Sequence, residues 1–152
     1  MKVFSLFILI LFTYNQLNAQ SPNANYDSVL AKKLNANSNG MKRYYLVILK
    51  TGPVTIPDKT KLDSIFSGHM KNIGELASKN KLAVAGPLGK NDKSYRGIFI
   101  LNTESKDEAE KMVESDPAVQ ANVLAAEYYP LFASAALMQT LEIHKKIVKI
   151  NP

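Results

Sequence analysis

The chain has 152 residues, of which 46% are hydrophobic and 21% charged, an ordinary composition for one globular domain. Its net charge of +6 comes mainly from scattered lysines, which we interpret as solvated surface, and we expect no nucleic-acid partner. The absence of cysteine excludes disulfides, and two histidines without cysteine argue against a dedicated transition-metal site. The sequence has no phosphate-binding or dinucleotide-binding fingerprint, so we expect no cofactor.

Residues 1–20 are predicted to be a secretory signal peptide. Lys2 precedes the apolar run Val3–Phe12, and Ala19 is the small residue of a cleavage region. The alternative is a membrane anchor, but the run is shorter than the roughly 20 residues that span a bilayer. We therefore expect an exported protein, periplasmic or secreted, without stable membrane insertion after cleavage. Residues 21–42 are predicted to be an extension or linker, in which Tyr26–Leu34 has the spacing of a short amphipathic helix lying on the domain.

The first strand and the first long helix of the domain follow. Arg43–Lys50 is predicted to be a central strand, because β-branched, aromatic and leucine side chains run almost without a break. Asp58–Asn80 has the apolar repeat of one helix face. Gly68 and Gly74 lie inside this helix, and each costs roughly 1 kcal/mol relative to Ala. We therefore expect close packing against them.

The centre of the chain predicts a hairpin followed by a second helix and a fourth strand. Leu82–Leu88 and Tyr95–Leu101 are apolar runs joined by a polar turn, and Gly97 is expected to be a bulge or a point of close approach. The second helix begins at Ser105, a capping residue. Val123–Leu131 is the predicted fourth strand.

This order of elements predicts a ferredoxin-like βαββαβ sandwich of the α+β class, with both helices on one face of the sheet. The domain is expected to span residues 43–141, with residues 132–141 helical. Residues 142–152 form a basic tail whose spacing permits a helix or a strand. The other sheet face needs a cover, to which the N-terminal extension or the tail can contribute. A second copy supplies the rest, so we expect a homodimer.

Three polar residues form a candidate site. His69 lies within the apolar arc of the first long helix, so its imidazole faces the sheet. Asp116 follows the second helix, which packs on the same face, and the two side chains can converge. A carboxylate beside an imidazole orients it for general acid–base chemistry. Arg96 can hold an anionic substrate through its guanidinium fork.

Each of these residues also has a purely structural interpretation. A lone histidine on a helix face is more often a core residue than a catalyst. Asp116 before Pro117 has the signature of a helix N-cap with proline at the first helical position. Arg96 can be a surface cation, and His144 is expected to be a surface residue.

Five motifs together resemble one known family, the YciI-like or YCII-related domain proteins, over about residues 26–137. The resemblance implies a ferredoxin-like dimeric α+β barrel and an active site that maps to His69 and Asp116. One family branch is similar to dehydrochlorinases of chlorinated hydroxyquinols, which implies a lyase or proton-transfer enzyme. We expect Arg96, Gly86, Pro87 and Asn72 to bind substrate. The signal peptide, extension and basic tail depart from the family pattern and argue against a cytoplasmic role in aromatic degradation. The motifs are YYLVILKTGP (44–53), GHMKNI (68–73), KLAVAGPL (81–88), YRGIFIL (95–101) and SDPAV (115–119).

Three functional hypotheses follow. The first is a small dimeric enzyme that uses His69 as general base, Asp116 to orient it, and Arg96 for binding. The second is a non-catalytic small-ligand-binding module of the cell envelope that uses the same pocket. The third is an RNA-recognition domain, which shares the element order. Arg96-Gly97 fits that domain, but Ile98 stands where a base-stacking aromatic residue is expected, so the first two hypotheses are favoured.

Overall fold

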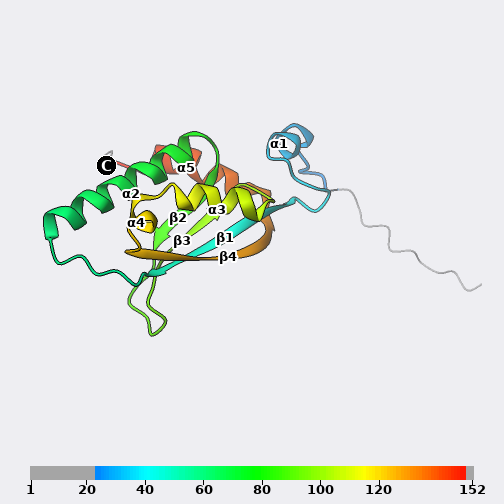
Figure 1. Ribbon diagram of the computed structural model, residues 1–152. Coiled ribbons are helices and arrows are strands. Elements are labelled where there is room, and N and C mark those ends of the chain that lie inside the picture. The colour runs from blue at the N-terminus through cyan, green and yellow to red at the C-terminus, as the bar shows by residue number, and fades with distance from the viewer. Residues whose placement is uncertain (1–22, 150–152) are drawn as a thin grey trace, which may run out of the picture.

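Four antiparallel strands form one sheet in the order β2-β3-β1-β4 in the computed structural model, which describes residues 23–149 (Figure 1). The two long helices, α2 (Lys59–Ser78) and α3 (Lys106–Glu114), lie on the same face of this sheet (Figure 1). This arrangement is the ferredoxin-like α+β fold, and it confirms the predicted element order. The strands are β1 (Met41–Thr51), β2 (Leu82–Pro87), β3 (Tyr95–Leu101) and β4 (Leu124–Ser134).

The predicted signal peptide, residues 1–20, lies outside the described residues, so export remains a prediction. Among the helices of residues 23–149, none is long and apolar enough to cross a membrane.

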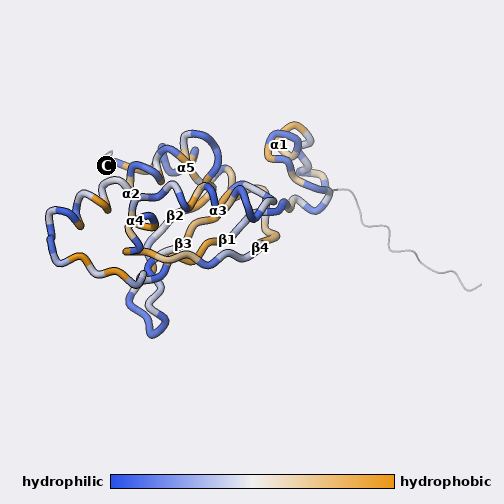
Figure 2. Tube along the Cα trace, in the orientation of Figure 1, coloured by the Kyte–Doolittle hydropathy of each residue, from blue (hydrophilic) through white to orange (hydrophobic). Residues whose placement is uncertain are grey.

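The hydrophobic core lies between the sheet and the two long helices. Alternate residues of each strand point toward the helices, as the two-residue period of a strand requires, and Figure 2 shows hydrophobic residues along β1. β1 pairs with a neighbour on both sides, which confirms the prediction of a central strand. The buried core consists of Val47, Leu49, Leu76, Leu82, Phe99, Leu101, Ala109, Met112, Val113, Ala118 and Leu124.

The opposite sheet face carries a row of half-buried apolar side chains, which we call the open face: Leu46, Ile48, Ile98 and Ile100. A C-terminal segment, η1 (Ala135–Gln139) and α5 (Thr140–Ile147), packs against β2, and η1 also contacts β1. At the start of β1, Tyr44 is buried and its hydroxyl donates a hydrogen bond to the carbonyl of Ser134, 3.1 Å away. The C-terminal segment therefore adjoins only one end of the sheet.

Strand pairing extends β4 beyond its predicted end. Residues 132–134 were expected to be helical, but they pair with Met41–Arg43 at the start of β1. This ladder joins segments far apart in the sequence, so nonlocal backbone hydrogen bonds override the local helical spacing. The tail after it, whose sequence permitted a helix or a strand, forms the helix α5.

Residues 26–34 were expected to lie on the domain, but they adjoin it only at the end of the segment, where Lys33 and Leu34 line a cavity with the C-terminal segment. The segment does form a helix, α1 (Ser28–Lys33), capped by the Asp27 side chain, but none of its residues is buried. Val29 is 77% exposed. In Figure 1 the helix stands at the side of the sandwich, away from α2 and α3.

Candidate active site

The imidazole of His69 lies between two aromatic rings under α2. Phe66, one turn earlier, meets it edge-on with ring centroids 6.0 Å apart. Phe99 of β3 stacks against it, with centroids 5.9 Å apart and an interplanar angle of 23°. The side chain of His69 is 12% exposed, so the ring faces the sheet while retaining contact with solvent. The sequence analysis did not single out Phe66 or Phe99, although Phe66 lies in the same apolar arc.

Asp116 is fully buried, and its two oxygens have different partners. Oδ2 lies 2.7 Å from Nδ1 of His69. Oδ1 accepts a hydrogen bond from the backbone N–H of Ala118 at 2.9 Å and caps the short helix α4 (Pro117–Gln120). The capping interpretation and the histidine-partner interpretation are therefore realised together, because a carboxylate can satisfy two donors at once.

The environment of Asp116 favours its charged form. Burial raises the pKa of the Asp116 carboxyl, but the hydrogen bonds from His69, Ala118 and Asn72 outweigh burial and hold its pKa below the ordinary value. A carboxylate only accepts hydrogen bonds, so Nδ1 of His69 is the donor in this pair. The neutral imidazole then carries its lone pair on Nε2, which is the nitrogen a general base needs free.

Asn72 contacts Asp116 and does not line the cavity beside His69, contrary to the expectation that it binds substrate. Its Nδ2 donates to Oδ2 of Asp116 at 3.3 Å, and its Oδ1 accepts from the Ser115 hydroxyl at 3.2 Å. Asn72 lies three residues after His69, on a neighbouring strip of α2 that faces α4 instead of the sheet. We therefore assign it a positioning role for the carboxylate.

Gly68 explains how α2 and α4 come close enough for this contact. A Cβ at Gly68 would lie 2.9 Å from Cγ of Pro117, so a larger residue would push the two helices apart. The expected close packing is thus present at Gly68. It is absent at Gly74, where a Cβ would have no described atom within 4 Å.

A cavity of about 410 Å³ opens beside the imidazole, between α2 and the edge of the sheet. Arg96, Gly86 and Pro87, all predicted to bind substrate, line it together with His69, whereas Asp116 does not. The arginine and the histidine are its charged or titratable lining residues. The remaining walls are apolar: Leu49, Phe66, Met70, Ile73, Ala85, Ile98, Phe99 and Leu124.

Arg96 lies at an irregularity of the β1–β3 ladder, beside this cavity. Leu49 pairs with Gly97 and Lys50 pairs with Tyr95, so Arg96 has no partner across the β1 ladder. A Cβ at Gly97 would lie 2.9 Å from the carbonyl oxygen of Gly86, which explains why glycine occupies this position. Gly97 is therefore the predicted point of close approach, and the exposed Arg96 beside it lines the cavity.

The described residues contain no group of three His, Cys, Asp or Glu side chains that could hold a metal ion. His69, which is paired with Asp116, and Arg96 are the titratable or charged residues that line this cavity.

The chain is similar to a known protein family and to several solved structures. Residues 43–131 match the YCII-related domain. Seven chains of solved structures match, among them 5-chloro-2-hydroxyhydroquinone dehydrochlorinase from Burkholderia phenoliruptrix, in complex with 2,5-dihydroxybenzoquinone. That structure is 28% identical, covers 58% of this chain and 90% of its own, and superposes with a TM-score of 0.40. A search of curated proteins found no match.

Proposed function

The chain belongs to the YCII-related domain family, and from that premise we propose that it is a small enzyme that moves a proton on a compact, partly apolar molecule. The observation that carries the proposal is the 2.7 Å contact between Asp116 and His69, whose imidazole lines a cavity. Burying a carboxylate costs desolvation, and a buried carboxylate that orients an imidazole beside a cavity suits general acid–base chemistry.

The proposed reaction begins with proton abstraction by His69. Nε2 takes a proton from an acidic hydroxyl or an activated carbon of the substrate, and Asp116 stabilises the resulting imidazolium. Arg96 holds the anionic oxygen that develops, through a charge-assisted hydrogen bond. In an elimination, the electron pair left on the substrate expels a leaving anion, and the imidazolium then releases its proton to water. In an isomerisation, the imidazolium returns the proton at another atom.

The cavity walls favour a flat substrate. Phe66 lines the cavity beside the imidazole, and a planar phenolic or quinonoid ring can pack against it with its oxygen toward His69, while the buried Phe99 supports the imidazole from behind. Charged groups elsewhere on the ligand would be desolvated against apolar walls, except near Arg96. We therefore propose a phenolic or small anionic substrate class.

Turnover by a His69→Gln variant tests this function. A thermal-shift screen of phenols and small carboxylates would first identify a stabilising compound, and product analysis would follow its conversion. We expect His69→Gln to lower turnover by at least about 100-fold, since general acid–base catalysis typically contributes 10²–10⁴-fold. The matched control is His144→Gln, which removes the chain's other histidine, exposed on α5, and should leave turnover unchanged.

Two outcomes would overturn the enzymatic proposal. Unchanged turnover in His69→Gln would remove His69 from the mechanism. A stabilising compound recovered chemically intact after long incubation would instead make the protein a ligand-binding module, which the largely apolar cavity also suits.

We also propose that a second copy covers the open face. Leu46, Ile48, Ile98 and Ile100 form a contiguous apolar surface on the two central strands that no long helix covers. Light scattering should give twice the mass of one chain, and Ile100→Lys should shift the protein to monomer. Val29→Lys, a comparable change at a 77% exposed site on α1, should leave the mass unchanged. A monomeric wild-type protein would contradict the assembly.

A further inference from the structure

A second cavity, of about 630 Å³, lies at the opposite end of β1 from the candidate active site. We call it the polar cleft. The end of α1, the start of β1 and the C-terminal segment form much of its wall, and several of these residues fall outside the region 43–131 that matches the family. The extensions that this chain adds to the YCII-related domain therefore build a cavity of their own. The residues that matter here are Lys33, Asn35, Lys42, Arg43, Glu104 and Gln139.

Three cations and two carboxylates line the polar cleft. Lys33, Lys42 and Arg43 carry the positive charges, and within residues 23–149 none of them has a carboxylate oxygen within 4.0 Å. Glu104 and Glu142 carry the negative charges, and Glu142 also pairs with Lys145, a cation outside the cavity wall, at 2.8 Å. The lining therefore keeps a small surplus of positive charge.

Lys42 is the most constrained of these cations. Its Nζ lies 2.6 Å from Oδ1 of Asn102 and 5.4 Å from the centroid of the Tyr44 ring. Burial lowers the pKa of Lys42, and the charge of Glu104 only partly counters this effect. The ammonium group is thus partly desolvated and bound to a neutral amide, which leaves a favourable position for an anion.

Neutral donors and acceptors complete the lining. The side chains of Asn35 and Gln139 make no hydrogen bond with the described part of the chain, although an amide can make several. These two amides can form hydrogen bonds with hydroxyl or carbonyl groups of a ligand whose charged group binds the cations.

We propose that the polar cleft binds a small anion of the phosphate or polycarboxylate class, independently of the His69 cavity. Such a ligand would tie α1 and the C-terminal segment to the start of β1, because all three line the same cavity. The ligand carries several charges, whereas the phenolic or small anionic substrate proposed for the His69 cavity must fit walls that are largely apolar.

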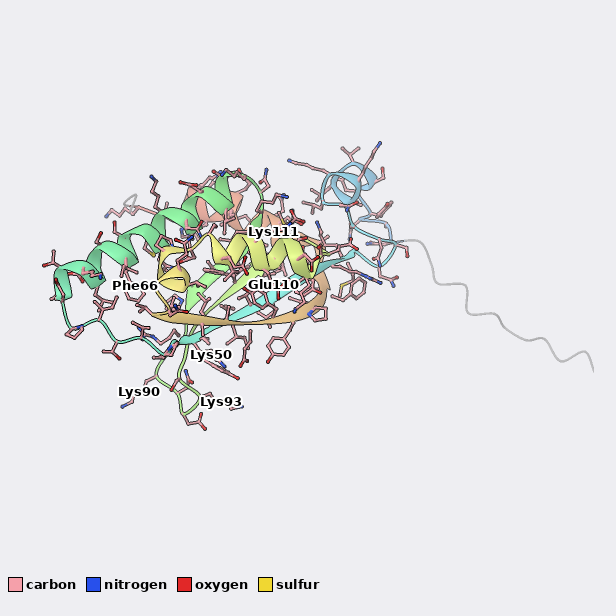
Figure 3. All side chains as sticks on the ribbon, viewed as in Figure 1. Lys50, Phe66, Lys90, Lys93, Glu110 and Lys111 are labelled. Atoms are coloured by element: carbon pink, nitrogen blue, oxygen red, sulfur yellow. The ribbon has the colours of Figure 1, made fainter. Side chains whose placement is uncertain are left out.

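Calorimetry and thermal-shift measurements on the full chain test this site, with pyrophosphate and citrate as probes and sodium chloride at matched ionic strength as reference. We expect saturable binding of one or both probes and a higher Tm. A double variant, Lys42→Gln with Arg43→Gln, removes two charges and keeps polar groups, and should weaken binding at least tenfold. The charge-matched control is Lys90→Gln with Lys93→Gln, on the β2–β3 loop that projects from the sheet (Figure 3), and it should bind as the wild type does.

The His69→Gln variant should retain full binding of these probes, which separates this site from the proposed reaction. If the double variant fails to fold, Arg43→Gln alone must still weaken binding, because this exposed side chain has no hydrogen bond to lose within the described residues. Equal affinity in the wild type and the charge variant, or a Tm rise no larger than with sodium chloride, would overturn the proposal.

Discussion

Replacing Asp116 with Ala should lower the free energy of unfolding by about 3 kcal/mol, since a lost cap costs about 1 and a buried donor left unpaired about 1–3. The substitution removes the acceptor for Ala118 at the start of α4 and the acceptor for Nδ1 of His69. It also releases Asn72. Urea unfolding, followed by circular dichroism, measures the change.

Asp58→Ala is the matched control for this prediction. Asp58 also caps a helix, α2, by accepting from the backbone N–H of Lys61, but it is exposed and has no histidine partner. Its loss should cost about 1 kcal/mol, as capping residues typically do. An equal loss of unfolding free energy in the two variants would show that the contact between Asp116 and His69 adds nothing to stability, which would contradict this prediction.

Gly52→Ala should destabilise the fold by about 2–3 kcal/mol, at the upper end of the cost of overpacking a close contact. A Cβ at Gly52 would overlap the carbonyl oxygen of Asn122 and lie 2.9 Å from the carbonyl carbon of Val123. Both are backbone atoms, so they cannot turn aside as a side chain would. Gly52 also donates to the carbonyl of Val123 at 2.8 Å, and Val54 donates to that of Asn122 at 3.1 Å. The substitution therefore disturbs the junction between the β1–α2 loop and the segment before β4.

The same substitution at Gly74 should raise the free energy of unfolding instead of lowering it. Gly74 lies inside α2, and a Cβ there would meet no described atom within 4 Å. Ala should therefore stabilise the helix by about 0.5–1 kcal/mol through its higher helix propensity. Unfolding midpoints of the two variants beside the wild type would check both, and destabilisation by Gly74→Ala would show that the position has a role which the geometry does not reveal.

Hydrophobic patterning allowed the fold to be predicted, because α2 follows the helical period closely and the strands β1 to β3 are nearly continuous apolar runs. The same periodicity fixed which way His69 points, since the helical repeat assigns each residue to a face. The end of β4 could not be predicted, because its last three residues are held by a partner some ninety positions away in the sequence. The exposed position of α1 could not be predicted either, since its apolar spacing matches that of a packed helix.

The site was predictable only in part. The sequence indicated His69, from its place on an apolar helix face, and Asp116, from the Asp-Pro pair after the second helix. Their 2.7 Å contact could be seen only in the folded structure. Asn72 was expected to bind substrate, but it contacts Asp116 and Ser115, because a motif gives the neighbours of His69 in sequence but not the strip of the helix on which each lies. The bulge at Arg96 depends on the register of β1 against β3, which single-strand patterns do not encode.

The double use of the Asp116 carboxylate, as helix cap and as partner of the imidazole, has an evolutionary consequence. A descendant without the proposed reaction would still be selected to keep the aspartate, because losing it would weaken the fold itself. Conservation of this aspartate across a lineage can therefore result from its contribution to stability as well as from a role in catalysis. Loss of the histidine beside an unchanged aspartate is the sequence signature that would mark a lineage in which catalysis has lapsed.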